Sequence, residues 1–286
     1  MIKNIVYKSL CLVLLIALVS CSQEEPINES NSKTPLRCMN DFKFWGQAHN
    51  GFLDDALENY QGEEATKAIG DEDARPNYEA LNTAQINYAR TLNLPSDEEE
   101  SLCTALEEYK PFYEPDKCFN DYFVNKTSNI PVIQQRINYL FSVHAIDSFE
   151  HTLLTSLITD VIKFENDILT PNGFQLRLQG YFLQWNDYYG YLTDDSKGQL
   201  SAYILSITDA SFSWWSENNV TGTRLAPWIA TDAAGAIVGG GVNAATQYIK
   251  HGRIKNWKTV GYNALASGVV ASTGVVGKLA KWFVRI

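Results

Sequence analysis

The chain has 286 residues, of which 45% are apolar and 20% charged, and its formal net charge is −10. A chain of this length and apolar content can bury a core in one or two domains, which excludes an intrinsically disordered protein. Residues 22–223 carry 13 basic and 32 acidic side chains, a net charge of −19, whereas residues 224–286 carry a net charge of +7. Because phosphate groups repel an acidic surface, this composition argues against a nucleic-acid partner.

The first 20 residues have the pattern of a signal peptide. Lys3 and Lys8 precede a run of ten apolar residues at positions 10–19. Ten helical residues span about 15 Å, roughly half the thickness of a bilayer core, so the run is too short to cross a membrane. A positive leader followed by a short apolar run is instead typical of a secretory signal that is removed from the mature protein.

The residues at the end of this run, Leu18-Val19-Ser20-Cys21, resemble the lipobox of bacterial lipoproteins. In that family the cysteine thiol receives diacylglycerol, the peptide before it is cleaved, and the exposed amino group is often acylated as well, typically with palmitate. The resemblance implies a signal peptide over residues 1–20, a lipid on Cys21 and membrane lipid as the partner of this anchor. Residues 21–38 are rich in polar residues and proline, the composition of a flexible tether.

The sequence Ser22-Gln23-Glu24-Glu25-Pro26 directly follows the cysteine. A short acidic stretch at this place resembles the export signal that sends some lipoproteins to the outer face of the outer membrane. We therefore expect a lipid-anchored protein of the cell outer membrane that is exposed at the surface, with the periplasmic face as the alternative.

Three cysteines remain in the mature chain besides the lipidated one: Cys38, Cys103 and Cys118. The cell envelope is an oxidising compartment, so disulfides are expected there. Cys103 and Cys118 lie fifteen residues apart and are the predicted pair, which leaves Cys38 unpaired. No two cysteines in the sequence have the C-x-x-C spacing that is typical of a thiolate zinc site.

The segment 39–223 predicts an acidic domain built from helices. Apolar residues recur at helical spacing in four stretches, 77–94, 131–168, 174–191 and 199–217. The second stretch is too long for one helix, so we expect a break near Asp147, Ser148 as the N-cap of the second helix, and Asn172-Gly173 as its end. The predicted fold class is all-α, a multi-helix bundle of five to seven helices.

Residues 224–286 predict a basic, glycine-rich helical hairpin. Small side chains recur at four-residue spacing, at Thr231, Gly235 and Gly239 and again at Ala264, Gly268 and Ser272. This spacing puts them on one face of each helix, where two backbones can approach closely. The stretch 231–240 resembles the glycine-zipper segments near the ends of many bacterial lipoproteins and of some bacteriocin-like peptides.

The hairpin could be buried against the acidic domain or inserted into a membrane. Insertion is indicated by two aromatic pairs that are each 20 residues apart, about one bilayer core: Trp228 with Tyr248, and Tyr262 with Trp282. The basic turn over 250–258 would suit lipid headgroups. Burial is favoured by polar residues inside these intervals, which are easier to satisfy in a protein than in hydrocarbon: Asp232, Asn243, Gln247 and Lys278.

Few residues suggest chemistry. His144, Asp147 and His151 have the spacing i, i+3, i+7 and could share a helix face that binds Zn²⁺, with Glu150 adjacent. A helix break at Asp147 would separate the two histidines, which favours capping or core roles, and we expect neither a metal nor a cofactor. Six aromatic residues on one predicted helix could stack on sugars, but their helical spacing fits a core: Tyr181, Phe182, Trp185, Tyr188, Tyr189 and Tyr191.

The sequence His49-Asn50-Gly51-Phe52-Leu53 resembles a His-Asn-x-x-Leu stretch near the start of some uncharacterised surface lipoproteins. Those proteins also end in an Asp-x-x-Gly-Ala segment, as residues 232–236 do here. The simpler interpretation of His49 is the start of an N-terminal helix whose dipole is met by Asp54 and Asp55.

The sequence contains no serine-hydrolase elbow, phosphate loop or nucleotide-binding motif. We therefore expect a protein that is not an enzyme but a structural or interaction protein of the cell envelope, with a second envelope protein as a partner. The alternative is a membrane-active, bacteriocin-like protein that uses the C-terminal hairpin.

Overall fold

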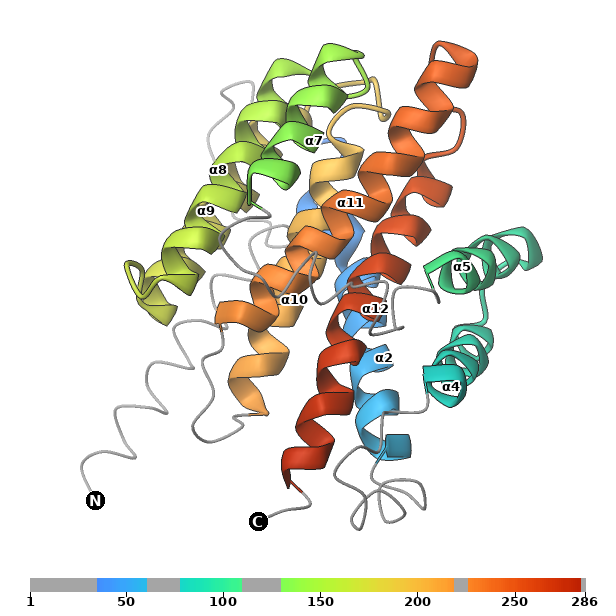
Figure 1. Ribbon diagram of the computed structural model, residues 1–286. Helices are drawn as coiled ribbons and strands as arrows, with labels where there is room; N and C mark the ends of the chain where they lie inside the picture. The colour runs from blue at the N-terminus through green and yellow to red at the C-terminus, as the bar shows by residue number, and fades with distance from the viewer. Residues whose placement is uncertain (1–34, 61–77, 110–129, 219–225, 284–286) are drawn as a thin grey trace, which may run out of the picture. The chain divides into compact units, whose positions relative to one another are not determined.

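The computed structural model describes residues 35–60, 78–109, 130–218 and 226–283 (Figure 1). Contacts between residues group 35–286 into one unit. Every regular element in the described ranges is a helix, so the prediction of an all-α multi-helix bundle is confirmed. In chain order these are the 3₁₀ helix η1 (Met39–Phe42) and the α-helices α2 (Lys43–Tyr60), α4 (Tyr78–Thr91), α5 (Ser96–Tyr109), α7 (Ile130–Ser142), α8 (Ser148–Glu165), α9 (Pro171–Tyr189), α10 (Gln199–Glu217), α11 (Ala226–His251) and α12 (Trp257–Phe283).

The start of α8 differs by one residue from the prediction. The break expected in the stretch 131–168 exists between α7 and α8, but the N-cap is Asp147 and not Ser148. The Asp147 side chain accepts a hydrogen bond from the backbone N–H of Glu150 at 2.9 Å. Aspartate and serine are about equally good N-caps, so side-chain type alone does not decide between two neighbours.

The start of α9 also corrects the prediction. Asn172 and Gly173 do not end the preceding helix pair but lie in the first turn of α9. Thr170 is the N-cap, and its hydroxyl accepts from the N–H of Gly173 at 3.1 Å. Pro171 occupies the first helical position, where its missing N–H costs nothing because that group has no partner within a helix.

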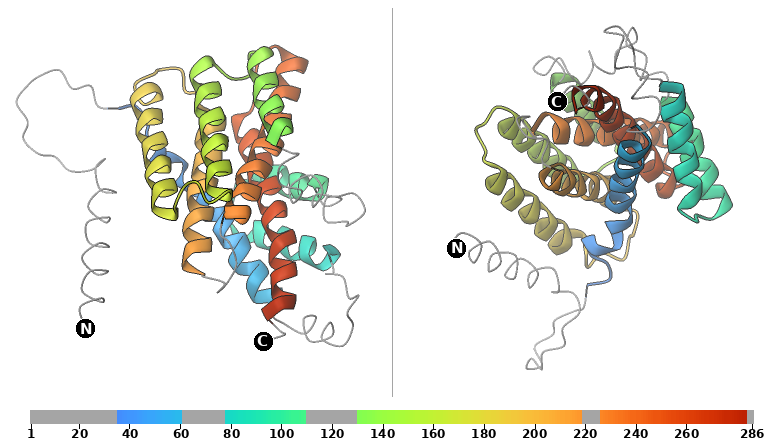
Figure 2. Two further views of the ribbon diagram at one scale, coloured as in Figure 1. Left: turned by 60° about the vertical axis from the view of Figure 1, so that its left-hand side comes forward. Right: turned by 90° about the horizontal axis from the view of Figure 1, so that it is seen from below.

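Helix α10 runs through the core of the bundle. It covers the predicted stretch 199–217, and it is buried on almost all sides because apolar residues surround its axis, among them Leu200, Ile204 and Ile207. It packs against α2, α9, α11 and α12. Helices α4 and α5 lie against α2 and α12 on one side, whereas α7 and α8 lie against α11 on another (Figure 2).

Helices α11 and α12 pack closely along their small residues. A methyl group added to Gly235 would lie 2.7 Å from the carbonyl oxygen of Ser267, and one added to Gly240 would lie 3.0 Å from Cβ of Ala264. The hydroxyl of Ser267 donates to the carbonyl of Gly235 at 2.7 Å. The four-residue spacing therefore brings two backbones together inside the bundle. Among the described helices, none combines the length and apolarity that crossing a membrane requires.

Candidate functional site

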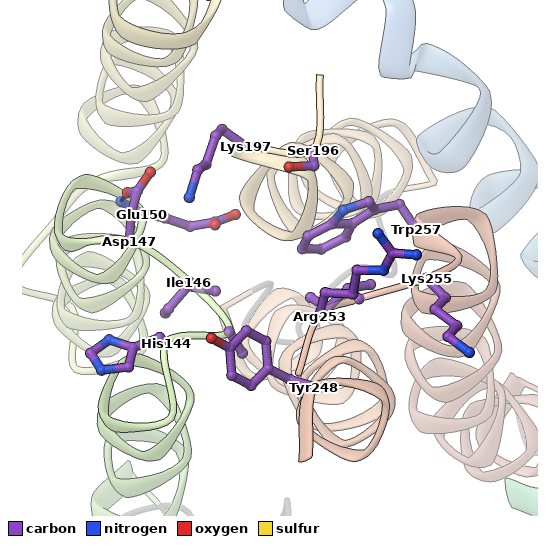
Figure 3. A pocket seen from close by; sticks show the side chains of 12 residues that line it. His144, Ile146, Asp147, Glu150, Ser196, Lys197, Tyr248, Arg253, Lys255 and Trp257 are labelled. Carbon is purple, nitrogen blue, oxygen red and sulfur yellow. Dashed lines mark hydrogen bonds between the residues drawn. The ribbon is translucent and has the colours of Figure 1, made fainter. Parts of the chain in front are cut away.

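Three helix connections meet at one end of the bundle, the upper end in Figure 1: α7 to α8, α9 to α10, and α11 to α12. A cavity of about 940 Å³ lies between them. Figure 3 shows its side chains, with Glu150 and Asp147 on the α8 side, Lys197 just before α10, and Arg253 and Trp257 on the side of α11 and α12. The cavity is large enough for a small molecule and is lined by charged groups of both signs.

Glu150 supplies the buried acid of this cavity. Its Oε1 accepts from the backbone N–H of Ser201 at 2.7 Å. Ser201 lies in the first turn of α10, whose N-cap is Gly198 with φ +71°, and a glycine has no side chain with which to cap a helix. Glu150 therefore provides from α8 the acceptor that the start of α10 needs, in the place that the helix dipole favours for a carboxylate.

Asp147 lies next to Glu150 in the wall of the cavity. Its Oδ1 accepts from the N–H of Glu150 and from the hydroxyl of Tyr189 at 2.7 Å. Burial raises the pKa of Glu150 to about 7, and the charge of Asp147 adds to this, while the hydrogen bonds from Ser201 and the charge of Lys197 oppose it. At neutral pH this carboxyl group is near its midpoint of ionisation.

The opposite wall is basic. Lys197 lies on the same side as Asp147 and Glu150 (Figure 3). On the opposite wall Arg253 and Lys255 are exposed, and within the part of the chain that the structure describes neither forms an ion pair. Next to them, the indole Nε1 of Trp257 is buried and has no hydrogen-bond partner; it is the one such side-chain atom among the described residues. An unpaired buried donor is costly, so this atom marks a place where an acceptor would bind favourably.

The connection from α11 to α12 is held in shape by its own backbone and by Gln247. Gly252 has φ +68°, a value that favours glycine, and its N–H donates to the carbonyl of Tyr248 at 2.7 Å, which closes the end of α11. The Gln247 side chain accepts from the N–H groups of Lys255 and Asn256, both at 2.9 Å. The basic side chains thus project from a fixed loop.

A second polar cluster lies in the interior and joins two residues that the sequence places far apart. His49 on α2 and Asp232 on α11 are both fully buried, with Nε2 of His49 3.6 Å from Oδ2 of Asp232. The Asp232 carboxylate accepts from the hydroxyl of Ser211 at 2.5 Å, from Nε1 of Trp215 at 3.3 Å, and from the hydroxyl of Ser272. The two segments that carry the resemblance to surface lipoproteins therefore meet in one network.

This network ties together four helices, α2, α10, α11 and α12. Burial raises the pKa of Asp232, and the nearby His49 and the three hydrogen bonds oppose that rise. Ser272 also lies 3.2 Å from Nε2 of His49, so serine and aspartate both face the same ring nitrogen. In a Ser-His-Asp hydrolase the aspartate instead binds Nδ1 and the serine binds Nε2. The arrangement here suits stabilisation of the core.

The simpler interpretation of His49 was wrong about its place. Helix α2 begins at Lys43, so His49 lies in its middle and not at its start. Asp54 is a further turn along and accepts from Nε1 of Trp214 at 2.7 Å, far from the N-terminal end of the helix dipole.

The three weak metal candidates have separate roles. Asp147 caps α8, and His144 lies in the connection before it with φ +59°. Nε2 of His151 lies 2.8 Å from Oδ1 of Asn138, and its ring packs against Phe141. Across the described ranges no three His, Cys, Asp or Glu side chains are grouped as metal ligands.

Other predicted residues fall partly outside the described ranges. This is the case for Cys21 and for Cys118, so the lipid anchor and the pairing of Cys118 with Cys103 stay predictions. The predicted aromatic helix, α9, buries Tyr181, Trp185 and Tyr189, as a core interpretation expects, while Tyr188 and Tyr191 remain exposed.

The cavity itself was not predicted from the sequence, although one signal for it was readable. Glu150 is on the apolar face of α8, three, four and seven residues before the buried Leu153, Leu154 and Leu157. A carboxylate inside an apolar stripe indicates a buried ionisable group, and such groups gather at functional sites. The basic turn over 250–258 indicated, from the sequence, only a surface for lipid headgroups.

Comparison of the chain with protein families, with curated proteins and with solved structures gives no match.

Proposed function

We propose that this chain is a lipid-anchored lipoprotein of the cell outer membrane that acts by binding another envelope component, not by catalysis. The sequence of the lipobox and tether supports the anchor. The observation that carries the binding role is the cavity at the end of the bundle, which has a fixed basic wall and an unpaired buried donor at Trp257. These are features of a binding site that is preformed in the free protein.

The place of Leu36 and Arg37, where the described part of the chain begins, fits this role. The Arg37 side chain donates to the carbonyl of Asp195 at 2.7 Å and to that of Lys197 at 2.6 Å, and the N–H of Leu36 donates to Gly190 at 2.7 Å. Lys197 also lines the cavity. The chain therefore enters the domain beside the cavity, and a lipid on Cys21 would tether the protein from that end.

The packing of α11 and α12 supports a binding protein over a membrane-active one. Insertion of this hairpin would break the hydrogen bonds that Asp232 accepts from Ser211 and Trp215. It would also place the Asp232 carboxylate in hydrocarbon. It would further expose residues of α2 and α10 that the hairpin now covers, such as Trp45, which packs against Tyr262, and Leu200, which lies next to Gly240. These changes cost free energy, because the hydrogen bonds and apolar contacts of these helices are already formed inside the bundle.

Metabolic labelling with an alkyne analogue of palmitate tests the anchor. The natural chain should be labelled and should sediment with outer membranes. Cys21→Ala should lose the label and leave the membrane fraction, while Cys38→Ala, the matched control in the next cysteine along the chain, should keep both. Label on Cys21→Ala equal to that of the natural chain would contradict the anchor.

A further inference from the structure

The unpaired indole of Trp257 has cationic neighbours on the same wall. Arg253 and Lys255 come from the connection that ends at Trp257, whereas Lys197, just before α10, lies across the cavity beside Glu150 and Asp147 (Figure 3). An indole N–H only donates, and guanidinium and ammonium groups only donate as well. The two cations and the indole on this wall therefore all require an acceptor.

The rest of the protein is acidic, so unpaired cations at this place are unexpected. The chain as a whole has a net charge of −10, yet Arg253 and Lys255 lie here without an ion-pair partner in the described ranges. By contrast, Lys258, only three residues from Lys255, is paired with Glu98 at 2.5 Å. Two acids line the cavity on its other side, and both already accept hydrogen bonds: Glu150 from Ser201, and Asp147 from the N–H of Glu150 and from Tyr189. They therefore leave the basic wall to other acceptors.

We propose that this wall binds a phosphate group, with Arg253 as the principal cation, Lys255 as a supporting charge, and Nε1 of Trp257 as a neutral donor. Arginine presents a planar set of donors that matches phosphate oxygens, and lysines act as point charges. The loop held by Gln247 and Gly252 presents these groups without a large ordering cost. This inference names the ligand of the binding site proposed above, and so it rests on that proposal.

Two sources could present the same phosphate chemistry at this place. One is a small soluble phosphate ester that enters the cavity. The other is the headgroup of an anionic phospholipid, since the tether joins the domain beside Lys197 and would hold this end near a membrane surface. Both require the same wall, and they differ in whether a lipid surface must be present.

The indole N–H resonance of Trp257 offers a direct readout. The mature chain carrying Cys21→Ala keeps every residue of the domain, and its seven tryptophans give separable ¹H–¹⁵N indole signals. Trp257→Phe identifies the signal of interest. Titration with inorganic phosphate, against sodium chloride at equal ionic strength, should move the Trp257 signal downfield to saturation, because the N–H gains an acceptor.

Two matched variants distinguish a specific phosphate site from non-specific electrostatic attraction. Arg253→Gln removes a cavity charge and should weaken phosphate binding about tenfold, as expected for the loss of one charged hydrogen bond. Lys250→Gln removes an equal charge from the same end of the bundle but outside the cavity lining, and should change binding less than about twofold. Far-UV circular dichroism and the remaining indole signals confirm that both variants are folded.

A sedimentation assay distinguishes the sources. The same proteins are mixed with vesicles of phosphatidylcholine, with or without phosphatidylglycerol. Binding to phosphatidylglycerol vesicles that Arg253→Gln loses and Lys250→Gln keeps supports a headgroup, and a saturable phosphate shift without vesicle binding supports a soluble ester. No Trp257 response and no vesicle binding, or equal losses in both variants, would overturn the phosphate site. The labelling of Cys21 is unaffected by these results, so the anchor is judged separately.

Discussion

Asp232 and Glu150 are both buried carboxylates, but the polar groups around them differ in how completely they are hydrogen-bonded. In the interior network, every donor that faces Asp232 has an acceptor, and the carboxylate accepts from three side chains. In the cavity at the end of the bundle, Glu150 is satisfied by Ser201, but Trp257 and the basic side chains across from it are not. A closed network stabilises a fold, whereas an open one leaves donors for a ligand.

This difference assigns distinct roles to two polar regions of one bundle. Substitutions in the Asp232 network should chiefly change stability. Substitutions on the basic wall of the cavity should chiefly change binding, because those side chains are exposed and carry no part of the core. Glu150 lies between these cases, since it caps α10 and also lines the cavity.

The largest expected effect is that of Asp232→Ala. It would remove the acceptor that Ser211, Trp215 and Ser272 share in a fully buried place, and we expect a loss of about 3–5 kcal/mol in the free energy of unfolding. Urea unfolding followed by circular dichroism measures it. The control is Asp187→Ala on the exposed face of α9, which should stay within about 0.5 kcal/mol. Equal midpoints for the two variants would contradict a structural role for the network.

The second prediction concerns Glu150→Gln and depends on pH. The pKa of Glu150 is raised from 4.5 to about 7 in the folded protein, so the folded state binds its proton more tightly than the unfolded state. The stability from this group is full below pH 4.5, falls as the pH rises to about 7, and stays low above it. Glutamine keeps an acceptor for Ser201 and carries no charge to bury. Above pH 7 the variant should therefore be more stable than the natural chain, by up to ~3 kcal/mol.

Urea unfolding at pH 4.5 and pH 8 tests this sign. The gain from Glu150→Gln should be present at pH 8 and nearly absent at pH 4.5. Glu100→Gln, on the exposed face of α5, should shift stability little at either pH. A variant that is less stable than the natural chain at pH 8 would show that the ionised carboxylate stabilises α10 by more than its burial costs.

The third prediction compares two helical glycines, Gly239 in a crowded place and Gly180 in an open one. A methyl group at Gly239 would collide with Ser267 and with the carbonyl of Asn263, so Gly239→Ala should destabilise the protein by about 1–3 kcal/mol. Gly180 on α9 has no atom within 4 Å of an added methyl group in the described structure. Gly180→Ala should instead stabilise by about 0.5–1 kcal/mol, because alanine has the higher helix propensity. Thermal unfolding of both variants checks the two signs, and a shift of the same sign would refute the close packing of α11 on α12.

The sequence predicted the helices better than it predicted the two polar clusters. Helix α10 was predicted with its bounds, because Leu200, Ile204 and Ile207 repeat with the period of a helix. The small residues of α11 and α12 correctly indicated close contact between backbones. They could not say what else would cover these helices, since α2 and α10 come from other parts of the chain.

The clusters depend on contacts across long sequence distances, which periodicity does not contain. His49 and Asp232 are more than 180 residues apart, and the two motifs that contain them were paired only as a resemblance to surface lipoproteins, not as neighbours in the fold. The cavity needs Glu150 from α8, Lys197 from the start of α10, and Trp257 from α12. Each residue has an ordinary local context, so their function as a group depends on the fold.

The smallest expected effect tests whether charge holds the C-terminal hairpin to the acidic part of the chain. The net charges of −19 and +7 suggest such an attraction, yet among the described residues of α11 and α12 the one lysine or arginine in an ion pair is Lys258, with Glu98. Lys258 is 64% exposed, so water and salt screen the pair, and Lys258→Ala should cost at most about 1 kcal/mol. Tyr262 would remain as a second donor to Glu98 at 2.5 Å. Urea unfolding at low and high salt measures the difference between Lys258→Ala and the natural chain. A loss above about 2 kcal/mol that vanishes in 1 M salt would show that charge, and not the apolar contacts and the Asp232 network, holds α12 in place.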